Sequence, residues 1–100
     1  MANLKTGGDT YTRDMGTLVS EMVPGTEYKF SDLIDLAYNH RLFPFLISEA
    51  GSLTPGDRSR LGKIIRRFVD RIFQHRYRFC LSGFSRNTER FFVQDLYPDQ

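Results

Sequence analysis

The chain has 100 residues, of which 40% are hydrophobic and 14% aromatic, and its net charge is +2. This length allows one domain with a single core, and the composition excludes a disordered chain. No apolar run approaches the ~20 residues of a membrane span, and residues 1–10 lack the apolar segment of a secretory signal. We therefore predict a soluble, cytoplasmic domain with no membrane partner.

The charge is unevenly distributed along the chain. Residues 1–50 carry four basic and seven acidic side chains, net −3, whereas residues 51–100 carry ten basic and five acidic ones, net +5. Nine of these ten cations are arginine, whose planar guanidinium suits fork-like recognition of phosphates and bases. The distribution indicates that the C-terminal half faces an anionic partner.

The N-terminal part predicts a tail and then a helix. Residues 1–10 include two glycines and few apolar side chains, so we predict a flexible tail ahead of a single domain at residues 11–97. Apolar side chains then recur with helical spacing from about Asp14, which predicts a short amphipathic helix ended by Pro24 and Gly25.

The next segment predicts a very short strand and a second helix. Residues 26–30 (TEYKF) place Tyr28 and Phe30 on one side of an extended stretch. Ser31 then suits a helix cap, and the apolar pattern carries this helix to about His40.

Residues 41–53 (RLFPFLISEAGSL) are too apolar for an exposed loop, yet Pro44 is incompatible with the middle of a regular helix. We expect a short or broken helix under the core, followed by a turn at Gly51. The alternative is that Phe43, Pro44 and Phe45 are exposed and bind a partner, including a second copy of the chain in a homodimer.

A long helix is predicted from Thr54 to Phe73. Thr54 can cap its N–H groups, Pro55 fits the first helical position, and Asp57 suits the positive end of the dipole. Its buried stripe has strict helical spacing. The stripe consists of Leu61, Ile64, Ile65, Phe68, Val69, Ile72 and Phe73.

The opposite side of this helix is cationic, with Asp70 as the only acid among its charges. Three interpretations stay open: a merely solvated face, a surface for a polyanion such as nucleic acid, and a surface for an acidic protein. The cations of this face are Arg60, Lys63, Arg66, Arg67 and Arg71.

A β-hairpin is predicted after the helix. Residues 76–84 alternate between apolar and polar side chains, and a second extended run at residues 90–97 follows a short polar connection. The connection carries Arg86 at the tip of the hairpin, and residues 98–100 are predicted to be a frayed end.

The order of these elements, together with residues 58–65 (RSRLGKII), resembles the small phage and bacterial winged helix-turn-helix proteins, whose third helix has an R-x-x-L-G-x-x-I pattern. The resemblance implies an α+β, winged-helix-like fold with three helices, a short strand and a C-terminal hairpin. In that fold the third helix enters the major groove and the hairpin wing touches the flanking backbone. The resemblance implies that Arg58, Ser59 and Arg60 read base edges, that Lys63 and Arg67 lie nearer phosphates, and that Arg86 lies at the tip of the wing. With Arg66 and Arg71 of the cationic face added, these are the predicted nucleic-acid-binding residues.

No catalytic arrangement stands out, so we predict a protein that is not an enzyme and needs no metal or cofactor. His40 and His75 each fall at a predicted helix end, where the dipole favours a cation. Cys80 is the single cysteine and fits a packing role in a strand. The leading hypothesis is therefore a small regulatory or accessory protein that binds duplex DNA, of phage or bacterial type. The alternative is a protein-interaction module, such as an inhibitor or adaptor.

Overall fold

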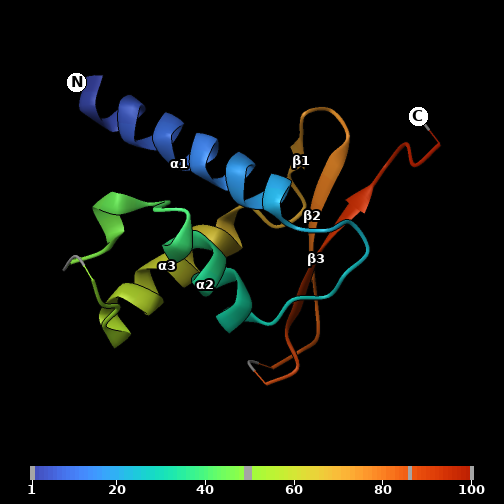
Figure 1. The fold of residues 1–100 in the computed structure, drawn as a ribbon. Coiled ribbons are helices and arrows are strands. Elements are labelled where there is room, and N and C mark those ends of the chain that lie inside the picture. The colour runs from blue at the N-terminus through green and yellow to red at the C-terminus, as the bar shows by residue number, and fades with distance from the viewer. Residues whose placement is uncertain (1, 49–50, 86, 100) are drawn as a thin grey trace.

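The computed structural model describes residues 2–48, 51–85 and 87–99, with side chains from Thr10 onward (Figure 1). The fold is α+β and combines three α-helices with a three-stranded antiparallel sheet. In chain order, the elements are α1 (Ala2–Glu21), α2 (Phe30–Asn39), the 3₁₀-helix η1 (Pro44–Leu46), α3 (Pro55–Arg67), β1 (Ile72–Phe73), β2 (Tyr77–Ser82) and β3 (Arg90–Asp95).

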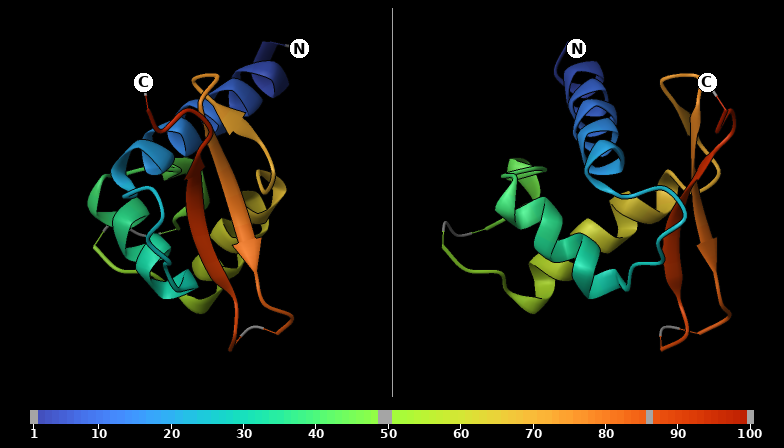
Figure 2. Two further views of the ribbon diagram at one scale, coloured as in Figure 1. Left: turned by 90° about the vertical axis from the view of Figure 1, so that its right-hand side faces the viewer. Right: turned by 45° about the vertical axis from the view of Figure 1, so that its right-hand side comes forward.

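The helices cover one face of the sheet (Figure 2). The strand order is β1-β2-β3, and β2 pairs with β3 in the register of a hairpin, from Tyr77 opposite Asp95 to Ser82 opposite Arg90. Because side chains alternate along a strand, β2 and β3 turn Phe79, Phe91 and Val93 toward the helices. The hairpin predicted from the alternating sequence is confirmed, with β3 ending at Asp95 rather than at residue 97.

The core is rich in phenylalanine. The rings of Phe79 and Phe91 stack with their centroids 5.7 Å apart, and both side chains are fully buried. Burial of one such side chain contributes about 1.5–3 kcal/mol to stability. The other buried apolar residues are Met15, Leu18, Val19, Met22, Leu33, Ile34, Ala37, Leu42, Phe43, Leu61, Ile64, Ile65, Phe68, Phe73 and Val93.

Helix α1 is longer than its apolar pattern predicts. It begins at Ala2 instead of near Asp14, so the backbone is helical through most of the segment expected to be a tail. The flexibility of residues 1–10 stays a prediction. The Asp14 carboxylate is buried, and it accepts a hydrogen bond of 2.9 Å from the N–H of Phe43. This bond joins α1 to the segment that follows α2.

Helix α2 begins one residue before the predicted cap at Ser31. Lys29 is the N-cap residue, and the Asp32 carboxylate accepts a hydrogen bond of 2.9 Å from its N–H. The predicted strand at residues 26–30 is reduced to a single bridge, in which Tyr28 and Phe91 exchange backbone hydrogen bonds of 2.7 and 2.8 Å. The strand prediction was wrong beyond this pair because Phe30 already belongs to α2.

The short helix expected in residues 41–53 is η1. Phe43 precedes it with a φ of +57° and is fully buried, whereas Phe45 is 76% exposed. The predicted patch of Phe43, Pro44 and Phe45 is therefore divided between the core and the surface.

Helix α3 starts as predicted but ends at Arg67, so the prediction of a helix to Phe73 was wrong. Asp70 takes a φ of +72°, its N–H donates to the carbonyl of Phe79, and residues 72–73 form β1. The apolar spacing over residues 68–73 fits a helix, but backbone pairing with β2 overrides it. Ile72 is 54% exposed as a result.

Candidate nucleic-acid interface

The first turn of α3 is held by a reciprocal cap. The N–H of Asp57 donates to Thr54 Oγ1, and the N–H groups of Thr54 and Ser48 donate to the Asp57 carboxylate, each at 3.1 Å. The hydrogen bond from Thr54 is the largest cause that lowers the pKa of Asp57 from 3.8 to about 2, against the opposing effect of burial. The cap sets where α3 begins and therefore which cations its first two turns present.

Arg60 ties α3 to η1. Its Nε donates to the carbonyl of Leu46 at 3.2 Å, and its guanidinium pairs with the buried carboxylate of Asp57. The side chain is 48% exposed. The predicted role of Arg60 in reading base edges stays a prediction; the structure shows a side chain already engaged in two intramolecular contacts.

Arg66 joins α3 to the hairpin. Its guanidinium makes two hydrogen bonds with the Glu89 carboxylate, at 2.9 and 3.3 Å, and lies 4.8 Å from the centroid of the Phe30 ring. Gly62 makes room for that ring, since a Cβ at this position would lie 3.0 Å from Phe30. One arginine thus connects α2, α3 and the turn before β3.

Besides Arg60, four polar residues of α3 are exposed on the side away from the core: Arg58, Ser59, Lys63 and Arg67. Within the part of the chain that the structure describes, none of the three cations is paired with a carboxylate. These cations keep the cationic character predicted for this side of the helix.

The last two predicted binding residues lie elsewhere. Arg71 follows the end of α3, and its guanidinium lies 5.1 Å from the centroid of the Phe68 ring. The structure therefore separates it from the helix that was expected to carry it. Arg86 lies outside the described residues.

A hollow of about 340 Å³ runs between α2, α3 and the start of β3. We call it the α3 groove. Three cations and one carboxylate face it, so its field is positive. The lining residues are Phe30, Pro55, Arg58, Ser59, Lys63, Arg66 and Glu89.

The acidic side chains of the N-terminal half gather at a different place. A second hollow, of about 420 Å³, lies on the other side of α2 and is lined by four carboxylates together with Tyr28, Leu36 and Asn39. Charge is therefore segregated in space as well as in sequence. The four carboxylates are Glu21, Glu27, Asp32 and Asp35.

A third hollow, of about 630 Å³, lies between the end of α2 and η1, where Arg41, Pro44 and Ile47 contribute to its wall. It contains part of the patch proposed for a protein partner. Pro44 is exposed and lines the hollow, Phe45 is exposed but does not line it, and Phe43 is part of the core.

The residues considered for other chemistry are scattered. Among the described residues no three His, Cys, Asp or Glu side chains are close enough to hold a metal ion. Burial raises the pKa of the Cys80 thiol and outweighs the opposing charge of Arg78, so the thiol is protonated near neutral pH. No described helix has both the length and the hydrophobicity needed to cross a bilayer.

Glu89 and Phe30 are functional candidates that sequence reasoning missed. Glu89 stands 23 residues from Arg66, and no local spacing relates the two. The sequence pattern predicts that Phe30 lies in a strand. Asp32, two residues later, suits the first turn of a helix that begins at Phe30, and this signal could have placed Phe30 in α2.

Comparisons with known proteins leave the site to be interpreted from its own geometry. No protein family, curated protein or solved structure matches the chain.

Proposed function

We propose that this protein binds duplex DNA through the exposed face of α3 and the β2–β3 hairpin. The observation that carries the proposal is the set of three exposed cations on one helix, Arg58, Lys63 and Arg67, beside a positive groove. Each phosphate that such a cation neutralises releases condensed counterions, which drives association. On this proposal, the protein is a regulatory or accessory factor that acts through DNA binding.

The dimensions of α3 support this assignment. Its 13 residues make a rod about 20 Å long, at 1.5 Å per residue. The major groove of B-DNA is about 12 Å wide and accepts one α-helix. With its buried stripe against the core, α3 can enter that groove only with the side that carries Ser59 and Lys63.

The layout of the sheet also favours a winged-helix arrangement. The Tyr28–Phe91 bridge attaches the α1–α2 connection to the edge of β3, in the position of the short strand that precedes the second helix in that layout. The hairpin turn and the first turns of α2 and α3 lie at the same end of the molecule (Figures 1 and 2). A duplex on α3 would therefore pass the hairpin as well.

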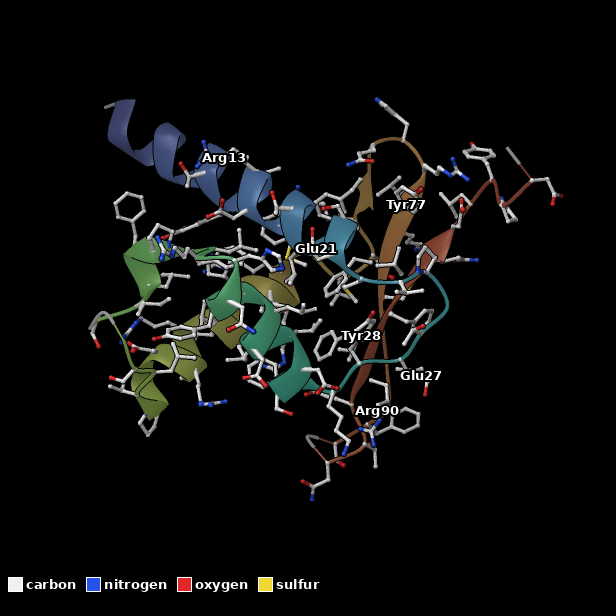
Figure 3. The ribbon with its side chains drawn as sticks, viewed as in Figure 1. Arg13, Glu21, Glu27, Tyr28, Tyr77 and Arg90 are labelled. Carbon is white, nitrogen blue, oxygen red and sulfur yellow. The ribbon has the colours of Figure 1, made fainter. Side chains whose placement is uncertain are left out.

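Fluorescence anisotropy with a labelled duplex of about two helical turns, ~20 base pairs, tests the proposal. Lys63→Ala and Arg67→Ala should each weaken binding and lower the slope of log K against log salt by about 0.9 for each phosphate that is no longer neutralised. Arg13→Ala is the matched control, because Arg13 is a 75% exposed cation on α1, away from α3 (Figure 3).

Absence of binding at about 50 mM salt with micromolar protein would contradict the proposal, since even non-specific contacts give dissociation constants of about 10⁻⁴–10⁻⁶ M at higher salt. An equal weakening by Lys63→Ala and Arg13→Ala would also contradict it. That result would show attraction by the whole molecule rather than by α3.

The second candidate function is the binding of a protein through η1. Phe45 is 76% exposed, and the residue before it, Pro44, lines the 630 Å³ hollow, so η1 offers an apolar surface of the kind that interaction sites use. Phe45→Ser should abolish such binding, or self-association seen by size-exclusion chromatography, and leave the fold intact. Phe43→Ser should unfold the domain because Phe43 is fully buried.

A further inference from the structure

The turn between β2 and β3 presents a phenylalanine to solvent. Phe84 has a relative exposure of 107%, more than any other described large apolar side chain, the next being Phe45 at 76%. A ring that is not packed against the core contributes nothing to the stability of the fold. The ring is therefore free to contact a partner.

Hydrogen bonds join the described residues on the two sides of this turn. Thr88 Oγ1 accepts from the N–H groups of Phe84 and Ser85, at 3.2 and 3.1 Å, and the carbonyl of Ser85 accepts from the N–H groups of Thr88 and Glu89, at 3.0 and 2.9 Å. Gly83 has a φ of +98°, and a Cβ there would lie 2.3 Å from the carbonyl oxygen of Thr88. Because the backbone N–H groups of Phe84 and Ser85 are held in this way, less entropy is lost when the exposed ring is bound.

The turn is also tied to the α3 groove. Glu89, which closes the turn, holds Arg66 on α3, and Arg90 follows at the lower end of β3 (Figure 3). In both views of Figure 2 the turn projects past the ends of α2 and α3. Phe84 is not among the residues that line the groove, but the next residue, Ser85, accepts a hydrogen bond from the N–H of Glu89, which does line it. An exposed ring in the same turn as a groove residue suits a ligand that has both phosphates and flat aromatic faces, which is a nucleic acid.

We infer that Phe84 stacks on an unpaired base next to the duplex held by α3, so that the substrate class is duplex DNA with a locally unpaired site. In a fully paired duplex the ring could enter only by unstacking a base step, which costs a few kcal/mol. At an unpaired base no base step has to be unstacked, so the full stacking energy contributes to binding. The inference rests on the proposed function, since α3 must hold the adjacent duplex.

Two labelled duplexes test the inference. They share the same sequence, but one is fully paired and the other contains a single unpaired 2-aminopurine. The wild-type protein should bind the second more tightly by about tenfold, the order expected for one base–aromatic stack. Phe84→Ala should remove this preference and Phe84→Tyr should keep it. Phe45→Ala is the matched control, because it removes another exposed ring, which lies on η1 and not in the β2–β3 turn. Melting curves of the variants confirm that each is folded.

The emission of 2-aminopurine gives a second readout, which should change on binding of the wild type and not of Phe84→Ala. Equal affinity of the wild type for the two duplexes would overturn the inference, and so would an equal weakening by Phe84→Ala on both. The proposed function would survive either result. Absence of binding to both duplexes would instead refute the proposed function.

Discussion

Removal of the charge of Glu89 should weaken the fold and strengthen DNA binding at the same time. The Glu89 side chain is 13% exposed and bonded twice to Arg66, which is 34% exposed. Gln keeps the shape of the side chain and one hydrogen-bond acceptor. Glu89→Gln should therefore lower the free energy of unfolding by about 1 kcal/mol, because the loss of a partly buried charge-assisted hydrogen bond is offset in part by the renewed hydration of Arg66. For a domain of this size that destabilisation lowers Tm by roughly 4–8 °C.

The effect on binding has the opposite sign. With Glu89 neutral, Arg66 gains freedom to reach a phosphate, and one negative charge leaves the α3 groove. Affinity at low salt should rise several-fold, and the slope of log K against log salt should steepen by about 0.9. The assays are thermal unfolding by circular dichroism and anisotropy over a salt series.

Glu27→Gln is the control for the change in net charge. Glu27 is exposed on the α1–α2 connection and is not part of the α3 groove (Figure 3). Glu27→Gln should leave both the Tm and the slope of log K against log salt as in the wild type. If Glu89→Gln left the slope unchanged or weakened binding, Arg66 would not be a latent phosphate ligand, and the groove would not face DNA.

Three further changes test the fold around the site. Asp14→Ala should destabilise the protein by about 1–3 kcal/mol in urea unfolding, because it leaves the buried N–H of Phe43 without an acceptor. Gly83→Ala should cost more than Gly25→Ala, since both have positive φ but only the Cβ at Gly83 meets a carbonyl oxygen, at 2.3 Å; equal destabilisation in the same unfolding assay would contradict this. The pKa of Asp57 is about 2 in the folded protein against 3.8 in the unfolded chain, so its charge stabilises the fold above pH 3.8, and this stabilisation is lost as the pH falls through 2. In a plot of unfolding free energy against pH, Asp57→Asn should therefore reduce the fall in stability at acid pH.

The start of α3 and the hairpin could be predicted from the sequence because their signals are local. A cap such as Thr54 and Asp57 acts over three residues, and the alternation in residues 76–84 reports which side of a strand is buried. Each of these signals involves neighbours in the chain. The sequence by itself therefore determined the three helices, the hairpin and the cationic side of α3.

The end of α3, by contrast, depends on residues that are distant in the chain. Residues 68–73 fit a helix by spacing, and only the presence of β2 beside them makes them the start of a sheet. The same holds for Phe43, whose burial depends on a hydrogen bond to Asp14, 29 residues earlier.

The tertiary structure also decided which cations are available. Arg60 and Arg66 belong to the same helical pattern as Lys63, but Asp57 and Glu89 engage the first two and leave the third exposed. The Arg66–Glu89 pair depends on where the hairpin turn places a carboxylate, which helical spacing cannot encode, whereas the Arg60–Asp57 pair joins two residues one turn apart within α3. The amphipathic pattern specifies that α3 has a basic side, and the packing of the hairpin against α2 and α3 specifies how much of that side can meet a ligand.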